Sequence, residues 1–272
     1  MQNLYNVNGL MFWSQEEILL RDSIKNLIVS ELTRTLKSAN SAFELIQVEA
    51  PLLTPSNLIN VNYTSDDVFQ LDDLTLRPET TMGSYVYAEH LLNPHNKRKV
   101  RLPLVVWQHG KSFRIEQDKT ISNMRLKEFY QLEFQIIYSS NTKMDYSTLV
   151  IPSIQGILTK LLGETRTEDS DRLPSYSTRT VDVIHTATNM EICSISKRTD
   201  YEDNKVLEVA IGIDRWMFTY LINIIILDNE WLNQLTREEL LDLADRLITS
   251  LDCRKFSATQ EILDEYQNKY EY

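Results

Sequence analysis

The stretch Lys127-Glu-Phe-Tyr-Gln-Leu-Glu-Phe-Gln-Ile-Ile137 alternates between apolar and polar side chains along most of its length. Because successive side chains of a β-strand point to opposite faces of a sheet, this alternation predicts a strand with a core face and a polar working surface. Such a strand is typical of an antiparallel sheet that is covered on one side. The core face is predicted to carry Tyr130, Leu132, Phe134 and Ile136, and the polar face Phe129, Gln131, Glu133 and Gln135.

Segments on either side of this strand also alternate with a period of two. We expect strands at Leu104 to Gln108 and at Lys111 to Glu116, with turns near Gly110 and over 117–124. The acidic segment from Glu164 to Asp171 is predicted to be a loop. Further strands are predicted at Phe43 to Glu49, at Thr75 to Arg77 (entering a helix at Pro78), and near 179–185, 190–197 and 206–213.

Helix signals lie around these strands. Ser14-Gln-Glu-Glu17 is a capping box, and the apolar residues Ile18, Leu20, Ile24, Leu27, Ile28 and Leu32 follow it mostly three and four apart, so an amphipathic helix is expected from about 15 to 38. Further helices are predicted at 145–162, interrupted by Pro152, and from Asp214. Two more capping boxes, Thr236 to Glu239 and Ser257 to Gln260, predict a short helical C-terminal tail. The fold class is therefore predicted to be α+β, an antiparallel sheet flanked by helices.

The composition excludes several functions. The chain has 272 residues and a formal net charge of −11, with 42% hydrophobic and 25% charged residues, as in a globular protein with one large core. Its six glycines do not fit a dinucleotide or P-loop phosphate cradle, and its histidines and cysteines form no local zinc signature. The acidic balance argues against indiscriminate nucleic-acid binding. The two cysteines, the polar N-terminus and the shortness of the longest apolar run predict a cytoplasmic protein with no membrane partner.

Polar residues of neighbouring strands are predicted to share one face of the sheet. Arg114 and Glu116 would lie beside Phe129 and the carboxylate and amides of the following strand. Arginine suits a phosphate, an aromatic ring suits base stacking, and a carboxylate suits an amine or a magnesium ion. This combination favours a nucleotide site. The alternative is that these side chains simply face water, as on most half-polar strands.

The stretch Val206-Leu-Glu-Val-Ala-Ile-Gly-Ile-Asp-Arg215 is a second candidate site. Glu208, Ala210 and Gly212 alternate to one face, where small residues beside one carboxylate leave room for a ligand, and Arg215 begins the next helix. The alternative is a core strand in which the glycine marks close packing.

Together these stretches resemble, in order, the signature motifs of class II aminoacyl-tRNA synthetases. Val48-Glu-Ala-Pro51 looks like motif 1, Ser112-Phe-Arg-Ile-Glu116 with Arg125 and Lys127-Glu-Phe129 looks like motif 2, and Glu208 to Arg215 looks like motif 3. Within the class the chain is most similar to dimeric-type glycyl-tRNA synthetase, through Leu76-Arg-Pro-Glu-Thr80 with Gly83, Gln108 to Glu116, and Glu191-Ile-Cys-Ser-Ile-Ser-Lys-Arg-Thr-Asp-Tyr201. The resemblance implies a class II synthetase-like catalytic core over residues 1–227, followed by a helical extension over 228–272.

The resemblance implies that ATP and Mg²⁺ bind on the polar face. Arg114, Glu116 and Arg215 form the implied catalytic set: Arg114 would bind the α-phosphate and the amino-acid carboxylate, Glu116 and Phe129 the adenine, and Arg215 its other face. Arg125, or Lys119 of the motif 2 loop, would reach the terminal phosphates. Glu191 is the implied magnesium ligand, with Glu208 as a second. Adenylate formation depends largely on positioning and charge stabilisation, so no protein nucleophile is needed.

For the amino acid, the resemblance implies a pocket lined by Glu79, Arg198 and Glu208, because carboxylates around an ammonium group suit a small zwitterion such as glycine. The chain departs from the family pattern in two places: the Glu-Pro-Ser triplet reads Glu208 to Ala210, and the Ala-Gln pair before Gly83 reads Thr81-Met82. Ala210 lacks the serine hydroxyl, so weakened glycine binding and relaxed selectivity are expected.

The resemblance also implies partners. Motif 1 implies a homodimer, and the acceptor of the activated amino acid would be a tRNA acceptor stem, a carrier protein or another nucleophile. The 45 residues after Leu227 are too few for the family's anticodon-binding domain of about 100 residues, so none is expected. The leading hypothesis is a ligase that adenylates glycine or another small amino acid with ATP. The alternative is a non-catalytic synthetase-like adaptor or an amino-acid sensor.

Overall fold

The computed structural model describes residues 5–7, 10–59, 63–97, 100–115, 124–171, 173–201 and 204–228, together with Thr236 and Glu239. The helices are α1 (Gln15–Ala39), α2 (Thr81–Leu92), α3 (Ser147–Leu162) and α4 (Ile213–Asp228), and a short 3-10 turn lies at Ser56–Leu58. The strands are β1 (Tyr5–Val7), β2 (Leu10–Phe12), β3 (Glu44–Gln47), β4 (Leu53–Pro55), β5 (Gln70–Leu71), β6 (Leu74–Leu76), β7 (Leu104–Phe113), β8 (Glu128–Ser139), β9 (Thr165–Asp169), β10 (Ser177–His185), β11 (Met190–Arg198) and β12 (Asn204–Gly212).

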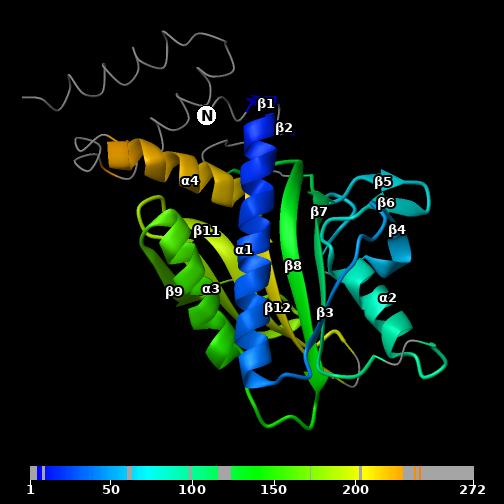
Figure 1. Ribbon diagram of the computed structural model, residues 1–272. Helices are drawn as coiled ribbons and strands as arrows, with labels where there is room; N and C mark the ends of the chain where they lie inside the picture. The colour runs from blue at the N-terminus through cyan, green and yellow to red at the C-terminus, as the bar shows by residue number, and fades with distance from the viewer. Residues whose placement is uncertain are drawn as a thin grey trace, which may run out of the picture.

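A large sheet of nine strands forms the centre of the described structure (Figure 1). Its order is β1-β2-β8-β12-β11-β10-β9, with β7 also paired to β8 and β3 paired to β7. The β3–β7 and β2–β8 pairs are parallel and the others are antiparallel. A separate small sheet has the order β4-β6-β5. The α+β class with an antiparallel-dominated sheet flanked by helices is confirmed.

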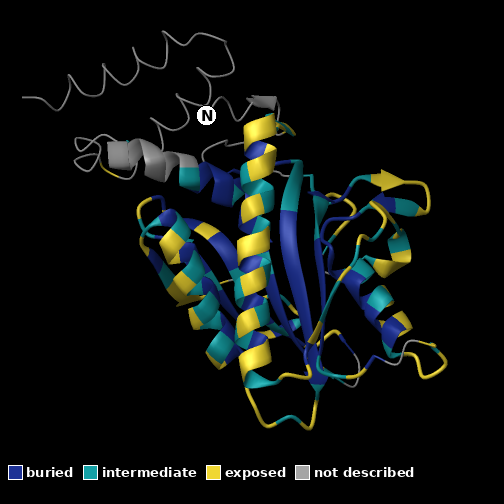
Figure 2. Ribbon diagram, viewed as in Figure 1, coloured by how far each residue is buried: buried dark blue, intermediate teal, exposed yellow. Residues whose placement is uncertain are grey.

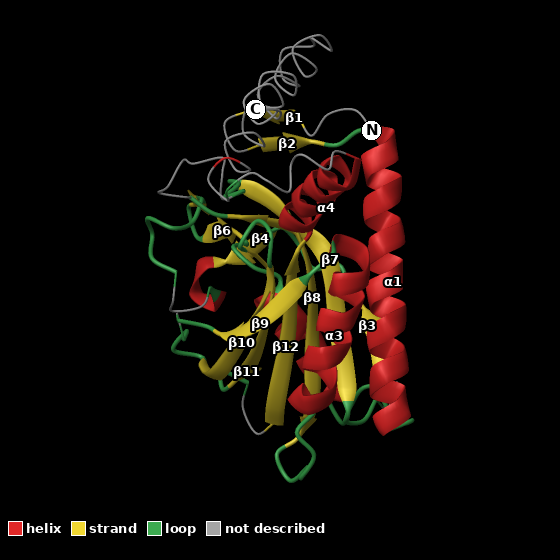
Figure 3. Cartoon of the chain, turned by 90° about the vertical axis from the view of Figure 1, so that its left-hand side faces the viewer, coloured by secondary structure: helices red, strands yellow, loops and turns green. Residues whose placement is uncertain are grey.

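Helices cover the two faces of the large sheet unequally. Helices α1, α3 and α4 pack on one face, while α2 and the small sheet lie on the other (Figures 1 and 3). The larger apolar core lies beneath α1, α3 and α4, and a smaller one lies beneath α2. Part of the second face is therefore left uncovered by helices beside α2. No helix among the described residues is long and apolar enough to span a membrane.

The alternation predicted for β8 and β12 is confirmed. Leu132, Phe134 and Ile136 of β8 belong to the larger core, as do the apolar residues of β12 at Leu207 and Val209. The opposite side chains of β8 do not simply face water, however, because Gln131, Glu133 and Gln135 are buried (Figure 2). These polar groups lie on the second face, where they are partly covered from the side of α2.

The capping box of α1 is present. Ser14 Oγ accepts from the backbone N–H of Glu17, and the Glu17 carboxylate accepts from the backbone N–H of Ser14 at 2.7 Å. The buried stripe runs through Ile24, Ile28, Leu32 and Leu36, whereas Ile18 and Leu27, which the spacing predicts to lie on the stripe, are exposed.

Two segments differ from the sequence prediction. The turn expected near Gly110 is wrong, because β7 runs without a break from Leu104 to Phe113. The glycine leaves room for the guanidinium of Arg77, which a Cβ at position 110 would displace from its hydrogen bonds to the carbonyls of Lys111 and Ala50. The acidic loop expected over 164–171 is also wrong: its residues Thr165–Asp169 form β9, an edge strand whose last three side chains are exposed.

The start of α2 also differs from the sequence prediction. The sequence predicts that the helix begins at Pro78, but it begins at Thr81, with Thr80 as its N-cap. Residues 78–80 turn toward β8 instead, because the backbone N–H of Thr80 donates to Glu133 Oε2 at 3.0 Å. In the C-terminal tail, Thr236 and Glu239 form the expected capping box. The second tail helix, with Ser257, lies outside the described residues.

Candidate active site

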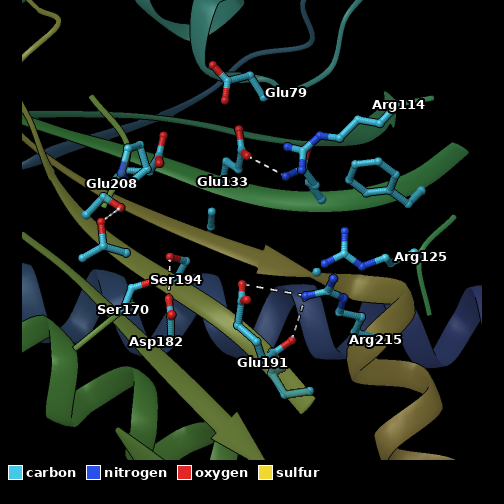
Figure 4. A pocket seen from close by; sticks show the side chains of 18 of the residues that line it. Glu79, Arg114, Arg125, Glu133, Ser170, Asp182, Glu191, Ser194, Glu208 and Arg215 are labelled. Atoms are coloured by element: carbon cyan, nitrogen blue, oxygen red, sulfur yellow. Dashed lines mark hydrogen bonds and ion pairs between the residues drawn. The ribbon is translucent and has the colours of Figure 1, made fainter. Parts of the chain in front are cut away.

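An open cleft of about 580 Å³ lies on the uncovered part of the second sheet face. Its floor is formed by β8, β12, β11 and β10, and its walls by the segment before α2 and by residues 168–171, 174 and 176. The cleft has an acidic end and an arginine-rich end (Figure 4). The residues discussed below that line it are Tyr63, Glu79, Arg114, Arg125, Phe129, Gln131, Glu133, Tyr176, Asp182, Glu191, Ser194, Glu208, Ala210, Asp214 and Arg215.

Three buried carboxylates form the acidic end. Glu79 comes from the segment before α2, Glu133 from β8 and Glu208 from β12. Glu133 accepts hydrogen bonds from the backbone and hydroxyl of Thr80 and from Gln131 Nε2 at 2.8 Å. Glu79 accepts from the Tyr63 hydroxyl at 3.3 Å. Three carboxylates so close together require positive charge nearby, because burial strongly disfavours unpaired anions.

Arg198 of β11 supplies the protein's own positive charge there. Its side chain is fully buried and donates to Glu208 Oε2 at 2.8 Å and to both oxygens of Asp200. Its guanidinium also lies 3.8 Å from the centroid of the Tyr176 ring. Burial alone would lower the pKa of Arg198, but Glu208 and Asp200 together raise it. Arg198 therefore anchors the carboxylates around it.

Several buried acceptors at the acidic end lack a hydrogen bond. Within the described part of the chain, Glu79 Oε1 and Gln131 Oε1 of the cleft lining, and Gln135 Oε1 beside Glu208, are buried without a partner. Arg198 Nη2 lies 3.8 Å from Glu79 Oε1, beyond hydrogen-bond distance. Such groups are costly unless a donor satisfies them, and each of these three can only accept. The acidic end therefore fits a ligand that carries several N–H donors and a positive charge.

Burial and the neighbouring carboxylates Glu208 and Glu79 raise the pKa of Glu133 to about 7. The folded protein thus binds a proton at Glu133 that the unfolded chain has released, so this group's contribution to stability falls as the pH rises from its ordinary pKa toward 7. A bound ammonium group favours the ionised carboxylate. We expect the affinity for an amino acid to rise with pH below about pH 7, by up to about tenfold per unit, and to level off above it.

Isothermal titration calorimetry of amino-acid binding across about pH 6 to 8 would measure this dependence. In Glu133→Gln the rise should disappear and binding should weaken throughout. A wild-type affinity that does not change over this range would contradict the assignment of Glu133 to the ammonium site.

The arginine-rich end lies at the other side of the cleft. Arg114 follows β7, its guanidinium lies 5.2 Å from the centroid of the Phe129 ring, and its Nε donates to the carbonyl of Pro78 at 3.0 Å. Arg215, in the first turn of α4, lies 3.8 Å from a carboxylate oxygen of Glu191 and donates to its backbone carbonyl. An aromatic ring beside one arginine, with a second arginine lining the same cleft, suits a base with attached phosphates.

The structure places nearly all of the candidate residues in this cleft. Arg114, Phe129, Arg125, Glu191 and Arg215 lie together at the arginine-rich end, and Glu79, Arg198, Glu208 and Ala210 at the acidic end or beside it (Figure 4). Glu116 and Lys119 lie outside the described residues. Arg198 contacts carboxylates of the protein rather than open space.

The two implied magnesium ligands lie apart. Glu208 pairs with Ser196 on β11, five residues from Glu191, which is about 17 Å along a strand. One ion cannot be held by both. Among the described residues, no group of three or more histidines, cysteines or carboxylates is arranged to hold a metal.

Several residues that position the side chains of the cleft were not given a role from the sequence. Thr81 Oγ1 and Gln135 Nε2 both donate to Glu208 Oε2, at 2.8 and 2.7 Å. Asp214, whose pKa burial raises to about 7, accepts from the backbone N–H of Tyr130 and so fixes the start of α4 beside Arg215. The alternation of β8 already placed Gln135 on the polar face. Nothing local in the sequence indicates the long-range partners of Thr81 and Asp214.

The sheet topology is that of a class II aminoacyl-tRNA synthetase core. Residues 63–223, more than half of the chain, match the family described as "tRNA synthetase class II core domain (G, H, P, S and T)". The chain belongs to this family.

Glycine–tRNA ligases are among the curated relatives of the chain. It is 28% identical to that of Mycoplasmopsis synoviae over 176 residues, covering 54% of this chain and 38% of the relative. It is 30% identical to that of Macrococcus caseolyticus over 154 residues, covering 53% and 32%. These matches span roughly a third of the relatives' own length.

A solved structure supports the fold. Prolyl-tRNA synthetase from Cryptosporidium parvum, complexed with L-proline and AMP, superposes with a TM-score of 0.61 and 14% identity, covering 79% of this chain and 47% of that one.

Proposed function

We propose that this chain activates a small amino acid, glycine or one close to it in size, by ATP-dependent adenylation, and transfers it to a tRNA acceptor stem or another nucleophile. The observation that carries the proposal is the pair of buried acceptors without a donor at Glu79 and Gln131 among the described residues, in the cleft that Arg114 and Phe129 also line. A zwitterion and a nucleotide placed there would meet at Arg114. The related glycine–tRNA ligases and the AMP-bound neighbour support this assignment.

In this proposal each side chain acts by position and charge. Glu79 and Glu133 hold the ammonium group, and Glu208 lines the pocket in a position fixed by Arg198, Thr81 and Gln135. Arg114 binds the amino-acid carboxylate and the α-phosphate, which brings the nucleophile to the phosphorus and stabilises the charge that develops there. Phe129 and Arg215 sandwich the adenine, Arg125 reaches the terminal phosphates, and Glu116 is assigned to the adenine by resemblance.

Glu191 fits the role of a magnesium ligand. Its carboxylate is about half exposed at the arginine-rich end, and magnesium is often bound by one or two carboxylates, with phosphate oxygens and waters completing the coordination. The bound ion would neutralise phosphate charge. Arg215, whose guanidinium lies beside the same carboxylate, would keep Glu191 oriented toward the phosphates.

Amino-acid-dependent ATP–pyrophosphate exchange with all twenty amino acids tests the proposal. We expect exchange with glycine or another small amino acid in the presence of magnesium. If no amino acid supports exchange, the chain is instead a non-catalytic adaptor or an amino-acid sensor; binding of an amino acid without exchange would identify the sensor.

The pocket floor beside Glu133 offers a test of selectivity. Ala210 pairs directly with Glu133 across β12 and β8, at the position where the family pattern has a serine. We expect Ala210→Ser to raise kcat/KM for glycine relative to alanine by about tenfold or more, because it adds a hydroxyl partner and removes space for a methyl group. The measurement is the ratio of the two exchange reactions. An unchanged or lower ratio would mean that Ala210 does not line the amino-acid pocket.

We also propose a cytoplasmic homodimer. The segment that resembles motif 1 follows α1, and exposed apolar side chains lie next to it at Leu52 and Leu53 and along α1 at Leu19 and Leu27. Two copies joined by a two-fold axis would bury them. Light scattering should give about twice the 31.8 kDa of one chain. A mass of one chain at all concentrations would refute the dimer.

A further inference from the structure

The floor of the cleft continues beyond the acidic end as one row of side chains that crosses the sheet. Glu133 of β8 pairs with Ala210 of β12, Ala210 pairs with Ser194 of β11, and Ser194 pairs with Asp182 of β10. Because paired residues of adjacent antiparallel strands point to the same face, all four line the same side of the sheet. Figure 4 shows Asp182 and Ser194 beside each other on the far side of the cleft from Glu133.

Asp182 has room and free hydrogen-bonding capacity. Among the described residues it forms no ion pair, and its one hydrogen bond comes from Ser194 Oγ, which donates to Oδ1 at 2.9 Å. Both side chains are half-buried and line the cleft. Since the Ser194 proton is already committed to Asp182, this pair offers only acceptors to a ligand.

We propose that Asp182 and Ser194 form a side-chain subsite, which takes a substrate amino acid whose side chain ends in a hydrogen-bond donor, an amine above all. This inference rests on the proposed function, in which the α-ammonium group binds at Glu79 and Glu133. The side chain then extends over Ala210 toward β10.

The sheet geometry sets the length of that side chain. Adjacent strands lie about 4.8 Å apart, so Ser194 is one strand and Asp182 two strands, about 10 Å, from Ala210. The Asp182 side chain and one hydrogen bond to its carboxylate span part of this distance. About 4 Å remains for the substrate side chain, which fits two carbons and a terminal nitrogen or oxygen. The small side chain of Ala210 and the absence of a side chain at Gly212 leave space for the substrate side chain to reach Asp182.

The chemistry of the subsite selects a donor over an apolar end. A methyl group placed there would remove water from the carboxylate without replacing its hydrogen bonds, which is unfavourable. An ammonium group would form a charge-assisted hydrogen bond with Asp182, the strongest of the available contacts. A hydroxyl group would form a weaker hydrogen bond with Asp182, because it is a neutral donor.

The test compares three amino acids of equal side-chain length in the full chain: L-2,4-diaminobutyrate, L-homoserine and L-norvaline. Equilibrium binding by calorimetry and pyrophosphate exchange are both measured, with glycine and alanine as references. We expect diaminobutyrate to be preferred over norvaline by about tenfold or more, with homoserine between them. Equal affinities of the three in the wild type would overturn the inference.

Two variants link the preference to the subsite. Asp182→Asn keeps the shape and can still accept from Ser194, so the preference for diaminobutyrate over norvaline should collapse to near parity. Ser194→Ala removes the hydrogen bond that orients Asp182 and should lower the preference in part, which keeps the test usable if the first variant folds poorly. Asp22→Asn, at a partly exposed position of α1 that does not line the cleft, is the matched control and should change nothing.

The outcomes separate this inference from the proposed function. Exchange with glycine or alanine, without a preference for donor side chains, refutes the subsite and leaves the proposed function standing. The absence of binding and exchange with every amino acid refutes the proposed function and the subsite with it. An unchanged preference in both variants refutes the assignment of Asp182 and Ser194.

Discussion

Arg198→Met is expected to lower the free energy of unfolding by about 3–5 kcal/mol, because it leaves buried carboxylates without their cation. The Arg198 side chain is completely buried, and its partners Glu208 and Glu79 are each only 7% exposed. Methionine has a similar length and fills much of the space, so the loss reflects charge rather than a cavity. Urea denaturation followed by circular dichroism would measure it.

The matched control is Arg179→Met. Arg179 forms an ion pair with Asp169 at 2.8 Å, but both side chains are at least half exposed, so its removal should cost no more than about 1 kcal/mol. A rescue experiment identifies the cause: Glu208→Gln added to Arg198→Met should recover part of the loss, because it removes one of the stranded charges. Equal effects at Arg198 and Arg179 would show that Arg198 does not neutralise the site.

The local sequence was sufficient to predict the sheet and its polar face. The alternation in 127–137 and 206–212 identified the faces of β8 and β12 correctly, since a period of two is a property of the strand itself. It was not sufficient at Gly110 or in the acidic segment. There the decisive factors are an arginine that crosses β7 and a pairing with β10, and both involve residues far away in sequence.

The candidate site shows the same division. Arg114, Phe129 and Arg215 could be found because each lies within a motif of a few residues. The hydrogen bonds that fix Glu208 come from Thr81 and Gln135, which are 127 and 73 residues away. The sequence also suggested that Arg198 faces the substrate, whereas in the structure its guanidinium is held by Asp200, Glu208 and Tyr176. The pairing of β11 with β12, which brings Arg198 beside Glu208, cannot be read from the local pattern.

Arg114→Ala is expected to reduce amino-acid-dependent pyrophosphate exchange by at least about a hundredfold, the effect typical of removing one preorganised donor from developing charge. Arg114 contacts residues at both ends of the cleft: it donates to the carbonyl of Pro78, next to Glu79, and its guanidinium lies over the ring of Phe129. Its loss removes the group that would bring the amino-acid carboxylate to the α-phosphate. Exchange kinetics at saturating ATP and amino acid would measure the effect on kcat.

The fold should survive this change, which separates a chemical role from a structural one. Arg114 is only half-buried, and the Pro78 carbonyl loses one hydrogen bond, worth about 0.5–1.5 kcal/mol. Arg114→Lys keeps the charge but loses the forked geometry, so its activity should lie between those of the wild type and the alanine variant. If Arg114→Ala kept full exchange activity with an unchanged unfolding curve, the adenylate would have to form elsewhere, and the assignment of the arginine-rich end to ATP would be wrong.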